Sequence, residues 1–269
     1  MIFDTHAHYD DDWFDEDREA LLRGLSSRGV DLVVNVGASM RGSRASVALS
    51  AEYPFVYASV GVHPDEAPSM TEADIEELRK LAAEKKVVAI GEIGFDYGHE
   101  DELTEEERDA QRAAQAYWFR RQLALAAELS LPVIIHSRGA EGDTLAVMRE
   151  YAESLPGGII HCFSGSPETA AAYRKLGFHI GVGGVITFKN ARRLPDVVAS
   201  APLSQIVLET DAPYMAPVPY RGKRNDSGYL PLVAEKIALI KGVTPEEVIR
   251  VTRANACELF GVGCEESVS

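Results

Sequence analysis

The sequence predicts an α/β protein whose fold is a (β/α)8 TIM-type barrel, in regular or distorted form. Short β-branched runs alternate with longer amphipathic stretches along all 269 residues, which is typical of repeated βα units around a parallel sheet. Apolar residues make up 46% and charged residues 26% of the chain, a composition that favours a globular protein with one large core. Because no linker-like stretch divides the chain, we expect a single domain over residues 1–269, with a disordered tail at 263–269.

Eight short, mostly β-branched runs are the candidate strands. In chain order they are Ile2–Thr5, Asp31–Val36, Phe55–Val60, Val87–Ile93, Pro132–His136, Gly158–His161, His179–Val182 and Ile206–Thr210. The helices expected between them begin with an oxygen-bearing cap followed by an acid in the first turn. Such starts occur at Thr71 with Asp74, at Thr104 with Glu107, at Ser166 with Glu168 and at Thr244 with Glu247. Gln111–Leu129 carries Ala, Leu and aromatic residues at helical spacing, which predicts a helix packed on the core.

An open, doubly wound sheet is the competing arrangement, and the polar residues at the strand ends favour the barrel. Five apolar runs end in, or lead directly into, a side chain that can bind a metal. These side chains are His6, His8, Glu92, His136, His161 and Asp211. In a barrel the carboxyl ends of all strands meet on one face, whereas an open sheet would spread them apart.

The same residues predict a metal centre. His6 and His8 are two residues apart on a strand, so both rings leave the same side of the chain. A buried carboxylate such as Glu92 or Asp211 needs a cation or a network of donors. Six ligands are too many for one tetrahedral zinc ion and suit two divalent cations. We expect His6, His8 and Asp211 to hold one cation, His136 and His161 to hold the other, and Glu92 to bridge them. Zn²⁺, Mn²⁺ and Mg²⁺ all remain candidates.

Seven ordered motifs resemble those of the TatD family of metal-dependent hydrolases, which are amidohydrolase-like barrels. They are Asp4–His8, Gly61–Pro64, Ile90–Tyr97, Pro132–Arg138, Ile160–Gly165, Leu208–Tyr214 and Arg221–Asn225. The resemblance runs from residue 2 to about Gly261. It implies a deoxyribonuclease or phosphoesterase that uses two divalent cations, and it places the family's metal ligands on the same six residues.

The chain departs from the family pattern at three places near the expected substrate entrance. His63-Pro64-Asp65 stands where many relatives have His-Pro-His, and the loop Tyr97–Thr104 is acidic. The segment Gly139–Gly142 resembles an insertion after the fifth strand. These departures bear on the substrate class more than on the metal site.

The expected reaction is attack on phosphorus by a hydroxide that two metal ions activate at a binuclear site. Asp211, Glu92 and His63 are the candidate catalytic residues. Asp211 would orient the attacking hydroxide and accept its proton, and His63 would contact the scissile phosphate or protonate the leaving oxygen. The alternative for His63 is a structural role in a turn. Glu209 has the opposite strand parity to Asp211 and is expected to contact the ligands from behind.

Candidate substrate-binding residues lie mainly in the long segment after the eighth strand. Arg221, Lys223 and Arg224 are flanked there by tyrosines, including Tyr214, and Arg138 follows His136 at the fifth strand. Cations interleaved with aromatic residues suit single-stranded nucleic acid, whose phosphates and stacked bases they contact. The competing interpretation is an ordinary solvated loop.

Charge and termini limit the function classes further. The chain has 27 Lys and Arg against 42 Asp and Glu, for a net charge of −15, which excludes a protein that binds nucleic acid over its whole surface. We expect a DNA substrate, preferably single-stranded or at strand ends, reached at a local site. The start of the chain has no secretory signal, and no long apolar run suggests a membrane span, so a cytoplasmic enzyme is expected. The alternatives are an amidohydrolase-type enzyme acting on a small ester, lactone, amide or phosphoester and, more remotely, a non-enzymatic binding scaffold.

Overall fold

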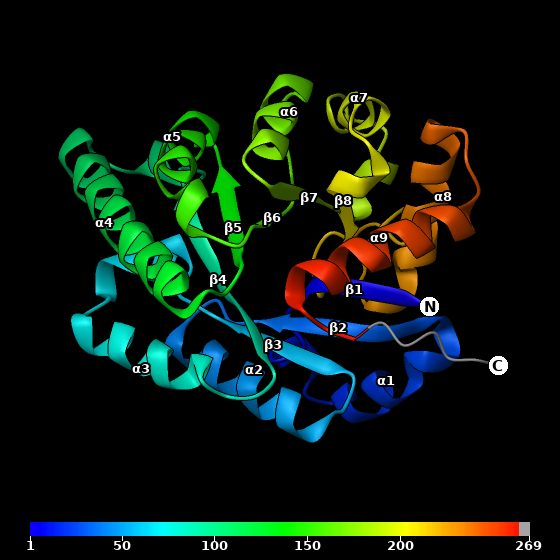
Figure 1. Cartoon of the computed structure of the whole chain (residues 1–269), viewed down its shortest axis with the longest axis horizontal. Coiled ribbons are helices and arrows are strands. Elements are labelled where there is room, and N and C mark those ends of the chain that lie inside the picture. Colours follow the sequence, from blue (N-terminus) through cyan, green and yellow to red (C-terminus); the bar gives the residue numbers. More distant parts are fainter. Residues whose placement is uncertain (264–269) are drawn as a thin grey trace.

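The computed structural model describes residues 1–263, and within them it confirms the barrel (Figure 1). Eight parallel strands pair in chain order around the sheet. They are β1 (Ile2–Ala7), β2 (Val30–Val36), β3 (Val56–Val60), β4 (Val87–Asp96), β5 (Val133–Arg138), β6 (Gly158–Ile160), β7 (Phe178–Val182) and β8 (Ile206–Leu208). The expected tail at 263–269 lies outside the described residues except for Gly263.

Helices surround the sheet, as the alternating sequence pattern predicts. They are α1 (Arg18–Gly24), α2 (Met40–Glu52), α3 (Glu72–Ala82), α4 (Glu105–Leu129), α5 (Glu141–Tyr151), α6 (Pro167–Lys175), α7 (Leu194–Ser200), α8 (Leu230–Lys241) and α9 (Pro245–Phe260). Short 3₁₀ turns are η1 (Asp12–Phe14), η2 (Ser26–Arg28), η3 (Pro64–Ser69), η4 (Glu100–Glu102), η5 (Ala152–Ser154), η6 (Gly184–Thr187), η7 (Leu203–Gln205) and η8 (Ser227–Tyr229). Thr71, Thr104, Ser166 and Thr244 are the N-caps of α3, α4, α6 and α9, which confirms the predicted helix starts.

The strand ends differ from the predicted ones in a way that shapes the site. β4 continues to Asp96, whereas β6 and β8 stop at Ile160 and Leu208. The residues that follow turn away from strand geometry, because Cys162 has a φ of 46° and Asp211 a φ of 57°. Non-glycine residues seldom adopt this left-handed conformation, and it is concentrated at functional sites.

The seam between β1 and β8 is the distorted part of the barrel. Within residues 1–263 an isolated bridge joins Ala7 of β1 to Ala212, which lies beyond the end of β8. The buried carboxylate of Asp4 accepts hydrogen bonds across the seam from the backbone N and the hydroxyl of Thr210, at 3.0 and 2.6 Å, and a further one from the Ser227 hydroxyl at 2.6 Å. Burial raises the pKa of Asp4 to about 7, although these hydrogen bonds oppose the shift. The backbone N of His8 also donates to the Ala212 carbonyl at 2.7 Å, and that of Asp211 to the His6 carbonyl at 2.8 Å, so backbone and side-chain bonds together close the barrel.

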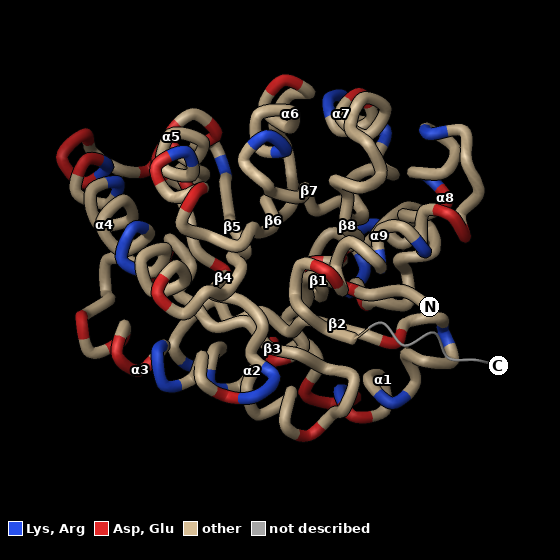
Figure 2. Tube along the Cα trace, viewed as in Figure 1, with Lys and Arg blue, Asp and Glu red and all other residues tan. Residues whose placement is uncertain are grey.

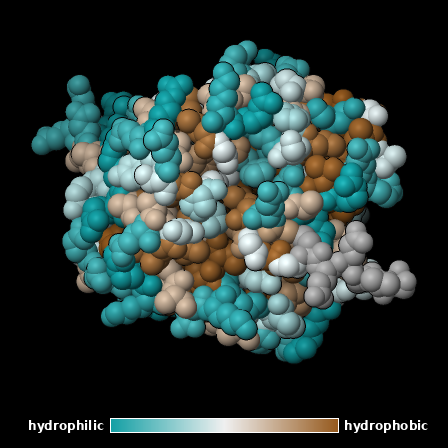
Figure 3. All heavy atoms as spheres, viewed as in Figure 1, coloured by the Kyte–Doolittle hydropathy of each residue, from teal (hydrophilic) through white to brown (hydrophobic). Residues whose placement is uncertain are grey.

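The core fills the barrel and the layer between sheet and helices. Every residue of β1 and β4 is buried, as expected for strands covered on both faces. In the view of Figure 3, hydrophobic residues gather in the centre of the face, over β4 and β5, and polar residues surround them. Charged residues lie mainly along the surrounding helices and loops (Figure 2). No helix in the described part of the chain is long and apolar enough to cross a membrane.

Candidate functional site

The six predicted metal ligands meet at one end of the barrel. They project from β1, β4 and β5 or from the residues just after β1, β6 and β8. A cavity of about 970 Å³ opens at this end, and all of the six except the fully buried His6 line it. Convergence follows from the fold, since parallel strands in a barrel place their carboxyl ends on the same face.

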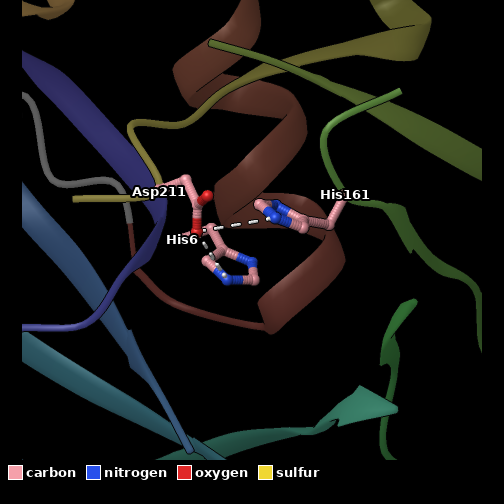
Figure 4. Close-up of side chains that lie close together, drawn as sticks. All are labelled: His6, His161 and Asp211. Atoms are coloured by element: carbon pink, nitrogen blue, oxygen red, sulfur yellow. Dashed lines mark ion pairs between the residues drawn. The ribbon is translucent and has the colours of Figure 1, made fainter. Parts of the chain in front are cut away.

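The first cluster joins β1 to the segments after β6 and β8. The Nε2 atoms of His6 and His8 are 3.1 Å apart, and Oδ1 of Asp211 lies 3.7 and 3.4 Å from them. Nε2 of His161 is 3.6 Å from the same oxygen, and the His161 ring stacks on the His6 ring with centroids 3.5 Å apart. Figure 4 shows His6, His161 and Asp211 pointing toward one another from separate segments. Side chains from widely separated parts of the sequence thus share one small volume.

Glu92 connects this cluster to a second one around His136. Its Oε2 atom lies 3.4 and 3.7 Å from Nε2 of His6 and of His8. Its Oε1 atom lies 2.7 Å from Nδ1 of His136 and 3.8 Å from Nε2 of His161. The two oxygens of one carboxylate therefore face different groups of imidazoles, which is the geometry that a bridging ligand requires.

The electrostatics of the clusters favour a positive charge between the side chains. Burial disfavours a charged His8, but the carboxylates of Asp211 and Glu92 raise its pKa to about 9. Burial also disfavours a charged His136, but the carboxylates of Asp96 and Glu92 raise its pKa to about 9. The site therefore binds protons tightly in the place where cations can bind instead.

In their neutral forms the imidazoles can turn a lone pair toward a metal ion. Nδ1 of His8 lies 2.9 Å from the carbonyl of Val36. Since a carbonyl only accepts, we assign a hydrogen to Nδ1, so that loss of the Nε2 proton leaves a lone pair facing the cluster. Burial and the neighbouring His161 lower the pKa of His6 to about 4, so this ring is neutral. Neutral imidazoles and ionised carboxylates are the donor set of transition-metal sites, and the residues present fit divalent cations.

Two further carboxylates orient the histidines. Asp96 of β4 has its Oδ2 2.9 Å from Nε2 of His136. Glu209, fully buried, has its Oε2 3.1 Å from Nδ1 of His161, and its Oε1 accepts a hydrogen bond from the Cys162 backbone N at 2.7 Å. The contact of Glu209 with a ligand was expected from the sequence, whereas Asp96 was not among the predicted site residues. The available signal for Asp96 was its strand parity, because it lies four residues after Glu92 on the same face.

Asn225 holds the turn that carries Asp211. Its Nδ2 atom donates to the carbonyls of Thr210 and Tyr214, at 2.9 and 2.8 Å, and its backbone N donates to the Pro213 carbonyl at 2.9 Å. These bonds span the residues before and after Asp211. Asn225 was part of a recognised motif, but nothing in the sequence showed that its amide would lie against this turn.

His63 combines the two roles considered for it. Its Nδ1 accepts a hydrogen bond from the Asp65 backbone N at 3.2 Å, so the ring caps η3. Its Nε2, 4.0 Å from Oε1 of Glu92, is turned toward the second cluster, and the ring lines the cavity. Burial lowers the pKa of His63. The cap leaves a hydrogen on Nε2 of the neutral ring, where it can be donated into the cavity.

A family model described as TatD-related DNase matches residues 3–261 of this chain. The chain belongs to this family. The metal-dependent hydrolase YabD of Bacillus subtilis is 41% identical, over 97% of this chain and 100% of its own length. The 3'-5' ssDNA/RNA exonuclease TatD of Salmonella typhimurium is 32% identical, over 97% and 99% of the two chains. The crystal structure of YjjV, a TatD homolog from Escherichia coli K12, superposes with a TM-score of 0.88 at 32% identity, covering 97% and 98%. As a TatD-family protein the chain is a metal-dependent hydrolase.

The residues proposed for substrate binding separate into two groups in this TatD-family barrel. Arg138 and Tyr214 line the cavity. Tyr214 is 48% exposed, its hydroxyl donates to Oδ2 of Asp11 at 2.9 Å, and its ring lies 6.2 Å from that of the exposed Trp13. An exposed aromatic pair beside the ligand clusters is a surface on which a base can stack.

Arg221, Lys223 and Arg224 form the other group, because none of the three is among the described residues that line the cavity. The guanidinium of Arg224 is paired with Asp17 at 2.7 Å. That of Arg221 lies 4.4 Å from the ring centroid of Phe188, and Lys223 is exposed. The cavity instead contains Arg192 and Arg193, which the sequence reasoning missed, although two adjacent arginines after the seventh strand were visible.

Proposed function

We propose that this TatD-family hydrolase is a nuclease that cleaves phosphodiester bonds of DNA with two bound divalent cations. The observation that carries the proposal is the division of the Glu92 carboxylate, with one oxygen on His6 and His8 and the other on His136. A single cation would need only one such group of ligands, whereas two cations a few Å apart suit phosphoryl transfer. The Salmonella relative, a 3'-5' exonuclease on single-stranded DNA and RNA, supports the substrate class.

The proposed ligands divide into two groups that share Glu92. His6, His8 and Asp211 would hold one cation, and His136 would hold the other together with His161, which also lies 3.6 Å from Oδ1 of Asp211. Glu92 faces both groups. When bound, the cations supply Lewis acidity, which lowers the pKa of a water and neutralises charge on the phosphate oxygens. Asp96 and Glu209 keep the rings of His136 and His161 in the orientation that this binding needs.

Asp211 is the proposed general base. Although burial opposes its charge, His161 and His8 hold its pKa below the usual range, so the carboxylate is ionised at neutral pH. It borders the cavity with a side chain that is 13% exposed, and it can therefore orient an attacking water and accept its proton. The hydrogen bonds of Asn225 on both sides of the turn keep that carboxylate in place.

His63 is the proposed donor to the substrate. Its Nε2 carries the hydrogen because Nδ1 is used in the cap of η3. From the edge of the second cluster this N–H can be donated to a phosphate oxygen or to the departing oxygen. A histidine held in this way adds a fixed donor to the site without adding a charge.

The proposed substrate is DNA at a strand end or in single-stranded form. A net charge of −15 repels a long duplex from most of the surface, and the reactive groups lie within a cavity rather than on an open face. Arg138 and Tyr214 are the proposed contacts to the nucleotide in the cavity. Arg221, Lys223 and Arg224 would contact only parts of the strand that extend beyond it.

A small-molecule substrate is the second candidate, and one observation favours it. Phe163, Val185, Leu194 and Met215 give part of the cavity an apolar lining. Such a lining beside a metal centre also suits a small ester or lactone, whose carbonyl carbon is attacked with the same side chains.

The test is metal analysis of the purified protein followed by chelation and readdition, with activity measured on single-stranded DNA, duplex DNA and small esters. We expect divalent metal in the protein and metal-dependent loss of single-stranded DNA. Asp211→Asn should lower kcat by about 10²–10⁴-fold, whereas the matched Asp109→Asn change, at an exposed position of α4, should leave it unchanged. Ester or lactone hydrolysis without DNA cleavage would show the second candidate to be correct.

A further inference from the structure

Two arginines enter the cavity from a loop that the proposed mechanism does not use. The chain from Phe188 to Arg193 connects η6 with α7 and carries three cations, Lys189, Arg192 and Arg193. Arg192 and Arg193 line the same cavity as the metal ligands. In Figure 2, segments coloured for Lys and Arg lie beside α7.

The ionic partners of the cavity cations differ. Arg138 has Nη1 3.8 Å from Oδ2 of the buried Asp96, so part of its charge is already balanced. Neither Arg192 nor Arg193 forms an ion pair within residues 1–263, and both are exposed. Other parts of the same cavity are acidic, with Asp10, Asp11 and Asp65 in its lining. Positive charge available to an anion is therefore concentrated at the loop before α7.

The cationic surface continues outside the cavity. The guanidinium of Arg221 lies 4.4 Å from the ring centroid of Phe188, the residue that precedes Lys189. Arg221, like Lys189, has no carboxylate partner in the described part of the chain. Arg224, by contrast, is occupied by Asp17 at 2.7 Å. A row of unpaired cations thus leads from the cavity over the loop before α7.

From this arrangement we infer that Arg192 and Arg193 are positioning residues that bind backbone phosphates of a single-stranded substrate next to the scissile one. The inference rests on the proposed nuclease function. Arginines bind phosphates through charge-assisted hydrogen bonds without reading sequence. A substrate with a single phosphate cannot bind at the metal centre and to Arg192 and Arg193 at the same time. The two arginines therefore favour a polynucleotide over a small ester, and they make the reaction depend on strand length.

The test compares the metal-loaded wild-type protein with the double variant Arg192→Ala/Arg193→Ala. Substrates are bis(p-nitrophenyl) phosphate, a dinucleotide and a single-stranded DNA oligonucleotide of roughly ten nucleotides. We expect kcat/KM on the oligonucleotide to fall by about 10-fold or more, mainly through KM, with unchanged kcat/KM on the small diester. The slope of log kcat/KM against log salt should become less steep by about 1.4, since each lost phosphate contact on a single strand removes about 0.7.

Two controls separate positioning from structural damage. Arg149→Ala/Arg174→Ala removes two exposed, unpaired arginines of α5 and α6 and should leave all three substrates unaffected. Arg192→Lys/Arg193→Lys keeps the charge and should restore most of the oligonucleotide activity. An equal loss on the small diester, or no loss on the oligonucleotide, would overturn the inference while the nuclease proposal stands. If the wild-type protein cleaves the small diester but no nucleic acid, the nuclease proposal fails and the inference fails with it.

Discussion

Oε2 of Glu209 lies 3.1 Å from Nδ1 of His161, and both side chains are buried. Although burial disfavours a charged imidazole, the neighbouring Glu209 raises the pKa of His161 well above its usual value. A carboxylate behind a ligand histidine fixes the orientation of the ring and increases its basicity. We therefore expect Glu209 to act on the reaction through His161.

Glu209→Gln should weaken metal binding by about 10–100-fold, because an amide orients His161 less strongly than a carboxylate does. Competition with a chromophoric chelator measures the affinity. Glu84→Gln, at an exposed position, is the matched control and should bind metal as the wild type does. Unchanged affinity in Glu209→Gln would show that His161 needs no such support.

Gly181→Ala should reproduce that loss without altering any polar group. A Cβ at position 181 would overlap the carboxylate of Glu209, and a buried side chain has no free space into which to move. We expect weaker metal binding together with a loss of about 1–3 kcal/mol in the free energy of unfolding. Both are measurable on one preparation by chelator competition and urea denaturation. At Gly142 an added Cβ meets nothing within 4 Å. Gly142→Ala should therefore neither weaken metal binding nor lower the free energy of unfolding.

Chelation should make the protein take up protons. In the absence of metal the pKa values of His8 and His136 are about 9, so both rings are protonated at pH 7.5, whereas a metal ligand must be neutral. Removing the metal at this pH therefore binds at least two protons, to which His161 can add because its pKa is also raised well above the usual value, and metal affinity rises with pH up to at least about 9. Calorimetric titration in buffers of different ionisation enthalpy counts the protons.

His8→Gln should lower that proton count by about one, since it removes one of the titrating rings. His179→Gln is the control, because His179 belongs to neither cluster. A heat of binding that is the same in every buffer would contradict the proposed ligand set.

Asn225→Ala should destabilise the protein and reduce activity together. It removes the donor to the Thr210 and Tyr214 carbonyls, and an unpaired buried carbonyl costs about 1–3 kcal/mol. Asp211 lies between these residues, so kcat should fall as well. Urea denaturation and steady-state kinetics test the two effects. Asn190→Ala, at an exposed position, should change the free energy of unfolding by less than about 0.5 kcal/mol. Normal kcat in a destabilised Asn225→Ala protein would separate the turn from catalysis.

The sequence by itself determined the barrel and the set of side chains that meet at one end of it. Hydrophobic periodicity depends on local residues, and it marked all eight strands to within a few positions. A ligand at the end of a strand needs no knowledge of loop structure, because parallel strands in a barrel bring their carboxyl ends together. His6, Glu92 and Asp211 could be grouped in advance for this reason.

Only the tertiary structure decided what surrounds those side chains. Loop conformation depends on contacts between residues far apart in the chain, which no local pattern encodes. Arg224 is turned to Asp17, 207 positions away, whereas Arg192 and Arg193 enter the cavity from a loop without a motif. The contact of Asp96 with His136 likewise required the extension of β4 beyond its predicted end. Strand ends are set by the barrel, but side chains that approach from the loops are set by packing and charge in three dimensions.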